Sequence, residues 1–129
     1  MATIRREVIV EAPADEVWDA IRDVGAAHRR VFPVVLTDVR MDGDARIVTF
    51  ANGLVVRELI VDVDDDARRF AWAAVGGRLT HHNASIQVFA DGDHRTRVVW
   101  ILDLLPNELR TDIAALMDLG MADLQHTLG

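Results

Sequence analysis

The chain has 129 residues, no cysteine and a formal net charge of −7 at pH 7. A chain of this length can bury a core as one domain, and the lack of cysteine excludes both a disulfide framework and a thiolate metal site. The negative charge, with no run of basic residues, argues against a nucleic-acid partner, because the phosphate backbone would be repelled.

Hydropathy along the chain argues against a membrane segment. No stretch approaches the roughly 20 apolar residues that a bilayer-spanning helix requires. Met1 to Glu7 carries charges where a secretory signal peptide has its apolar region. We therefore expect a cytoplasmic protein without a membrane span.

The first quarter of the chain predicts one strand and two short helices. Thr3 to Glu11 alternates between apolar and polar residues, which is typical of a strand. Ala12 to Glu16 combines an early proline with acidic residues, which predicts the start of a helix that Gly25 ends. Ala26 to Phe32 predicts a second short helix, ended by Pro33.

The middle of the chain predicts six further strands joined by tight turns. Asn52-Gly53 is the strongest turn signal, because both residues tolerate the positive φ of a type I′ hairpin. The other turns are marked by glycine or by clustered aspartates. The predicted strands cover residues 34–41, 45–51, 54–63, 68–75, 79–89 and 96–105.

The last segment, Pro106 to Leu128, predicts a long amphipathic helix of about six turns. Proline is accepted in the first turn of a helix, and the apolar residues recur at intervals that place them on one face. An antiparallel sheet buries one face, and this helix supplies the cover. The order of elements therefore predicts an α+β domain over residues 1–129, with a curved seven-stranded antiparallel sheet around a long C-terminal helix.

This order, together with the opening segment Val8-Ile9-Val10-Glu11-Ala12-Pro13-Ala14-Asp15-Glu16-Val17-Trp18, resembles the START-related helix-grip superfamily, SRPBCC. Many bacterial members are described as polyketide cyclase/dehydrase-like. The resemblance implies a helix-grip fold with a deep cavity between sheet and helix for an apolar or aromatic small molecule, lipid- or polyketide-like. Members include lipid carriers, aromatase/cyclases, hormone receptors and chaperone activators, so the fold alone does not select a function.

A weaker, local likeness is to the plant abscisic-acid receptors. Asp65 to Arg69 and Gly76 to Thr80 resemble the acidic turn and the latch loop of those receptors. The loop is shorter here, and the segment around Asp42-Gly43 offers no counterpart of their gate loop. The likeness therefore implies shared ancestry of the fold rather than hormone sensing.

Strand alternation indicates which side chains face the cavity. It directs His82 inward and the adjacent His81 outward. An imidazole at this position would hydrogen-bond a ligand or act as a general base, and the alternative is a histidine satisfied by a neighbouring backbone group. Core packing is likewise the alternative for the aromatic residues and methionines. The residues expected to line the cavity on this pattern are Phe70, Trp72, His82, Ala84, Trp100, Met117 and Met121.

The strand over residues 54–63 allows two assignments. One phase of the alternation directs Arg57 inward, and the other directs Glu58 inward. Asp62 and Asp64 must face water, which favours Arg57, and an inward arginine would suit a ligand carboxylate. The alternative is an arginine whose charged end reaches solvent.

Three functions follow from these observations. Binding of an apolar or aromatic small molecule is the favoured one, because catalysis needs at least two ionisable groups that converge in the cavity. The second is a polyketide cyclase or dehydratase, with His82 as the base and Arg57 stabilising an enolate. The third is a protein-interaction module, a monomer or a homodimer that uses outward apolar residues such as Leu54, Val56 and Ile60. No metal-ligand spacing or cofactor motif is present, so we expect neither a metal nor a cofactor.

Overall fold

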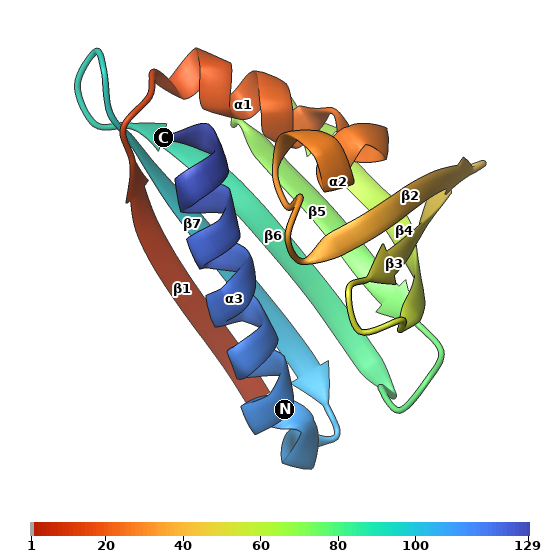
Figure 1. Ribbon diagram of the computed structural model, residues 1–129. Coiled ribbons are helices and arrows are strands. Elements are labelled where there is room, and N and C mark those ends of the chain that lie inside the picture. Colours follow the sequence, from red (N-terminus) through yellow and green to blue (C-terminus); the bar gives the residue numbers. More distant parts are fainter. Residues whose placement is uncertain (1) are drawn as a thin grey trace.

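The computed structural model describes residues 2–129, which form one sheet with helices on one side of it (Figure 1). The strands are β1 Ala2–Val10, β2 Leu36–Asp42, β3 Ala45–Phe50, β4 Val55–Asp64, β5 Arg69–Val75, β6 His81–Ala90 and β7 Thr96–Leu105. The helices are α1 Ala14–Arg22, α2 Ala27–Arg30 and α3 Arg110–Leu128, with short 3-10 helices η1 Val24–Ala26 and η2 Asn107–Leu109.

The sheet has seven strands in the order β1-β7-β6-β5-β4-β3-β2, and every neighbouring pair is antiparallel. Strands β2 to β7 follow one another as a meander, while β1 pairs with β7. The fold predicted from the order of elements is confirmed, including the seven strands, the short helices after β1 and the long C-terminal helix.

The helix α3 lies across the face of the sheet over β1, β7 and β6, whereas β2, β3 and β4 curl away from it (Figure 1). Met117, Met121 and Leu124 are buried against the sheet, and Leu119 on the opposite side of the helix is 64% exposed. The predicted amphipathic face is therefore the packed face. Among residues 2–129, no helix is both long and apolar enough to cross a lipid bilayer.

The hairpin between β3 and β4 differs from the predicted type I′ turn. The amide of Phe50 donates to the carbonyl of Leu54, which closes a three-residue loop, and Gly53 has a φ of +90°. Asn52 does not have the positive φ that type I′ requires at both central residues. The longer loop shifts the register by one residue, so that Arg46 pairs with Glu58.

A β-bulge in β4 settles which side chains of this strand face inward. The pairing with β5 shifts between Ile60 and Asp62, and the extra residue, Val61, is 62% exposed. A bulge inserts one residue into the alternation and so reverses its phase. Glu58 and Ile60 therefore face inward before the bulge, while Asp62 still faces solvent after it.

The observed orientation of β4 also differs from the predicted outward apolar surface. Val56 and Ile60 pack against the core, so their assignment to an outward surface is wrong. Leu54 is 53% exposed, and the exposed apolar residues of β4 are Val55, Leu59 and Val61. The expectation of a monomer or a homodimer stays a prediction.

Candidate functional site

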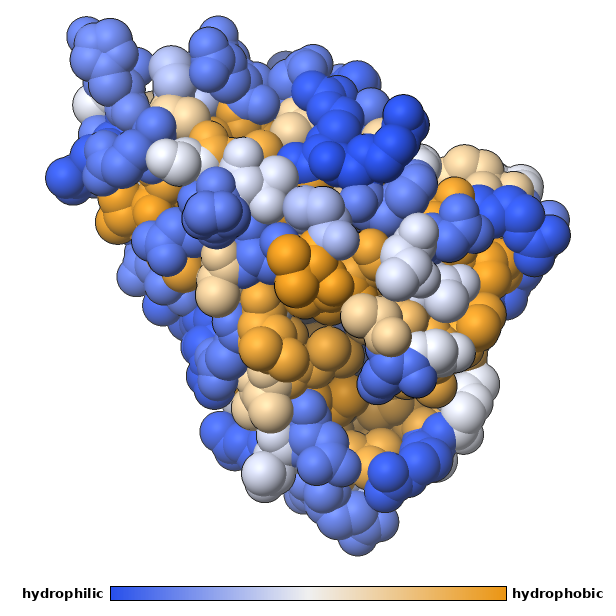
Figure 2. Space-filling view, viewed as in Figure 1, coloured by the Kyte–Doolittle hydropathy of each residue, from blue (hydrophilic) through white to orange (hydrophobic). Residues whose placement is uncertain are grey.

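A cavity of about 140 Å³ lies between α3, the sheet and the segment that follows α2. Cavities of this size hold one aromatic ring. Its wall includes Ile113, Leu116 and Met117 from α3, Phe32 and Val35 from the segment after α2, and inward residues of β3 to β7. Figure 2, in the view of Figure 1, shows apolar residues gathered around a hollow between α3 and the hairpins of β2 to β4.

Four of the predicted residues lie in the cavity wall: Trp72, His82, Trp100 and Met117. Three others, Phe70, Ala84 and Met121, are buried in the neighbouring core and do not line the cavity. Phe70 stacks against Trp72, with ring centroids 4.9 Å apart, and so packs beside the wall on the same face of the sheet. Strand alternation selects the correct face of the sheet but does not show where along that face the cavity lies.

Arg57 lies on the opposite face of the sheet, so its predicted inward orientation is wrong. The side chain is exposed and its Nη1 donates to Asp42 at 2.7 Å. The bulge after Ile60 is the physical reason, because it allows Asp62 to face water without requiring Arg57 to face inward.

The charged residues of the cavity wall are Arg46 and Glu58, which form a buried ion pair. Arg46 Nε donates to Glu58 Oε1 at 2.9 Å, and its Nη1 donates to the carbonyl of Val24 at 2.9 Å. The two side chains are only 6% and 11% exposed. The guanidinium also lies over the Phe70 ring, 5.0 Å from its centroid. The pair leaves this part of the wall with no net charge.

Arg46 was missed at the sequence level because its position depends on register. With a two-residue loop at Asn52-Gly53, Ile47 would have been opposite Glu58. The observed three-residue loop instead places Arg46 opposite Glu58. An opposite charge across an inward glutamate is the signal that would have identified Arg46, but only once the register was known.

His82 is held in one hydrogen-bonding state by the neighbouring strand. The backbone N–H of Ala74 donates to His82 Nδ1 at 2.9 Å, just beyond the last paired residues of β5 and β6. Burial, and secondarily the charge of His81, lowers the pKa of His82 from 6.5 to about 4. The neutral ring therefore carries its proton on Nε2, which makes His82 a hydrogen-bond donor through that atom and a poor base.

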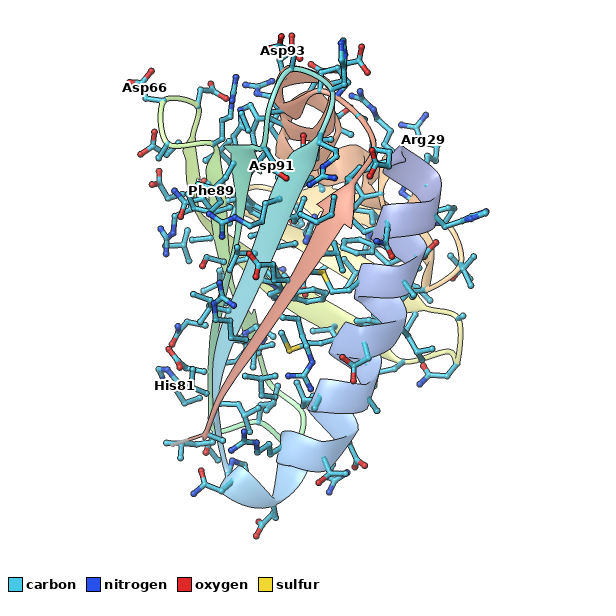
Figure 3. All side chains as sticks on the ribbon, turned by 90° about the vertical axis from the view of Figure 1, so that its left-hand side faces the viewer. Arg29, Asp66, His81, Phe89, Asp91 and Asp93 are labelled. Atoms are coloured by element: carbon cyan, nitrogen blue, oxygen red, sulfur yellow. The ribbon has the colours of Figure 1, made fainter. Side chains whose placement is uncertain are left out.

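His81 confirms the alternation of β6. It points away from α3 on the outer face of the sheet (Figure 3), where its Nε2 is 2.7 Å from Asn83 Oδ1. The two adjacent histidines therefore lie on opposite faces of the sheet. Within residues 2–129, no three histidine or acidic side chains come together as a metal-binding group.

Trp100 lines the cavity with its indole ring. Its Nε1 is buried and meets no acceptor in the described part of the chain. Its ring lies 5.9 Å from that of Trp72 and 6.0 Å from that of Phe32. Gly120 allows α3 to approach this ring, since a Cβ there would lie 2.9 Å from Trp100 Cζ3.

Asp123 fixes the position of the wall segment after α2. Its Oδ2 accepts hydrogen bonds from the backbone N–H groups of Val34 and Val35, both at 2.9 Å. The residue is buried on the inner side of α3. One carboxylate thus ties α3 to the segment that carries Val35 into the cavity wall.

The comparisons with known proteins agree with this architecture. The family model described as "Polyketide cyclase / dehydrase and lipid transport" matches residues 1–128. A search of curated proteins gives no match.

Solved structures share the fold over almost the whole chain. A protein from Bacillus thuringiensis superposes with a TM-score of 0.88 at 15% identity, covering 98% of both chains. A protein from Thermobifida fusca gives 0.78 at 29% identity, covering 99% of this chain and 91% of that one. A START superfamily protein from Mycobacterium smegmatis gives 0.78 at 12% identity, covering 98% and 96%. With a family model that spans the chain and a helix-grip fold around an apolar cavity, the protein belongs to the polyketide cyclase/dehydrase and lipid transport family.

Proposed function

We propose that the protein binds a small apolar or aromatic molecule in the cavity beneath α3. The observation that carries this proposal is the wall itself, in which the rings of two phenylalanines and two tryptophans, together with aliphatic side chains, surround a space of about 140 Å³. Such a space suits one aromatic ring. The family description, which names lipid transport beside cyclase activity, is consistent with a binding role.

The cyclase or dehydratase alternative has less support from the geometry. His82 uses its lone pair to accept from Ala74, so its ring offers a ligand no free basic nitrogen. Arg46 is already paired with Glu58, and the wall residues in the described chain include no hydroxyl or thiol nucleophile. A space for one ring is also small for a multi-ring polyketide. These features favour a carrier or sensor over an enzyme.

The first prediction concerns filling of the cavity. Leu116 lines the cavity from α3, whereas Leu119 lies on the exposed side of the same helix. We expect Leu116→Trp to abolish binding of single-ring aromatic compounds, measured by calorimetric titration, because the indole occupies the ligand volume. Some stability should be lost to overpacking, by about 1–3 kcal/mol.

Leu119→Trp is the matched control and should bind as the wild type does. Native mass spectrometry of the wild-type protein purified from its own host would complement the titration by detecting a retained small molecule. Equal affinities of the two tryptophan variants would show that the ligand binds elsewhere.

A further inference from the structure

The charged residues of the cavity wall indicate which net charge the ligand has. Arg46 and Glu58 are directly opposite one another and are buried together, so they cancel within the wall. An anionic ligand would add a second negative charge beside Glu58, and a cationic ligand would add a second positive charge beside Arg46. A net charge in a site of low dielectric constant is costly. The wall therefore favours an uncharged ligand.

The hydrogen-bonding groups of the wall are complementary to an acceptor. His82 Nδ1 is occupied by the N–H of Ala74, which leaves Nε2–H as its remaining group. Trp100 Nε1–H is a donor by its chemistry, and it is buried without an acceptor in the described residues. A buried donor gains from a partner supplied by a ligand, since leaving it unpaired is destabilising. Both aromatic residues line the same cavity.

We propose that the cavity selects an uncharged single-ring compound that carries a hydrogen-bond acceptor, such as an aryl ketone, and rejects aromatic acids and aromatic cations. This inference rests on the proposed function, because it specifies the ligand of the same cavity. All 14 basic residues of the chain other than histidine are arginine. A carbonyl ligand therefore meets no lysine with which to form an imine, and its binding is non-covalent.

Four compounds with the same arrangement of heavy atoms test this selection: acetophenone, benzoate, benzamidinium and α-methylstyrene. At pH 7 they are respectively an uncharged acceptor, an anion, a cation and an uncharged molecule without an acceptor. Calorimetric or NMR titration of the wild-type protein should show acetophenone binding most tightly. We expect α-methylstyrene to bind roughly two- to tenfold more weakly, as the loss of a neutral hydrogen bond implies. Both ions should bind at least about tenfold more weakly.

A charge variant of the wall should favour the anion among the four compounds. Glu58→Gln keeps the shape of the side chain and leaves the Arg46 charge uncompensated, so the affinity for benzoate should rise about tenfold or more relative to the affinity for acetophenone. Asp42→Asn is the matched control, because it removes one carboxylate charge from the pair that Asp42 makes with Arg57 outside the cavity. It should leave the order of the four compounds unchanged.

The outcomes separate this inference from the proposed function. Binding of α-methylstyrene as tightly as acetophenone, or tighter binding of either ion, would overturn the inference while leaving an aromatic site in place. No binding of any of the four would overturn both proposals. If Glu58→Gln does not fold, the order of the four compounds with the wild-type protein decides the inference without it.

Discussion

At the scale of single residues, His82 combines a structural and a binding role. Its ring accepts the N–H of Ala74 where the pairing of β5 and β6 ends, and the same ring lines the cavity and keeps its Nε2–H as a donor. The sequence allows two interpretations of His82: a histidine that faces the ligand and a histidine satisfied by the backbone. They are compatible, because Nδ1 accepts the backbone hydrogen bond and Nε2–H remains available to a ligand.

The low pKa of His82 predicts a pH dependence of stability. The folded protein keeps this ring neutral down to about pH 4, whereas the unfolded chain takes up a proton below about pH 6.5. The free energy of unfolding should therefore be unaffected by His82 above pH 6.5 and should fall as the pH decreases toward 4. Between pH 7 and 4.5 this contribution is about 2–3 kcal/mol.

Urea unfolding of the wild type and of His82→Gln at both pH values measures this contribution. The amide oxygen of glutamine can still accept from Ala74 but does not titrate. We expect the wild type to lose about 2–3 kcal/mol more than the variant on acidification, because the other titrating groups are common to both proteins. Parallel losses would show that the ring is protonated at the same pH in the folded and the unfolded chain.

At the scale of secondary-structure elements, α3 is held by a polar anchor as well as by its apolar face. Asp123 accepts two backbone hydrogen bonds from the segment after α2, at Val34 and Val35. Those amides lie outside any helix or strand, so the carboxylate takes the place of a backbone partner. The apolar spacing of the helix does not reveal this role, because an aspartate on the buried face does not fit the periodicity of apolar residues from which the helix is predicted.

Replacing this carboxylate should weaken the attachment. Asp123→Asn replaces the charged oxygen that accepts both amide hydrogen bonds with a neutral one, so we expect the free energy of unfolding to fall by about 1–3 kcal/mol. Asp118→Asn on the same helix is the control, because Asp118 is exposed and pairs with Arg6 at the surface. That change should cost less than about 1 kcal/mol. Chemical denaturation of both variants would distinguish them, and equal effects would refute the anchoring role.

At the scale of the whole molecule, the cavity lies where two apolar clusters meet. The larger cluster joins α1, α3 and the strands β1 and β5 to β7, and it includes Trp72 and Met117. The smaller cluster joins β2, β3 and α2, and it includes Leu36 and Val48. All four of these residues line the cavity. Because α3 covers one half of the sheet and the curled strands β2 to β4 form the other, the space between them is not filled by side chains.

The fold therefore depends on α3 as the cover of the sheet. Truncation after Leu105 removes the buried residues Met117, Met121 and Leu124 and exposes the inner faces of β1 and β7. We expect an insoluble or molten product without cooperative unfolding, because the apolar face of the sheet loses its partner. Circular dichroism during thermal denaturation checks this. A monomeric product that unfolds cooperatively would contradict the role assigned to α3.

The sequence by itself determined the elements, the order in which they occur and the inward faces of most strands. Alternation and helical spacing are local patterns, and burial of one face enforces them, so the inward positions of Trp72, His82 and Trp100 follow from the sequence.

Tertiary structure decided the polar content of the cavity. The loop after Phe50 and the bulge after Ile60 each change the alternation by one residue, and together they bring Arg46 opposite an inward Glu58 and place Arg57 outside. A single extra residue costs little locally but reverses the face of every side chain beyond it. The pairing of whole strands selects among such registers, and no local pattern in the sequence does so.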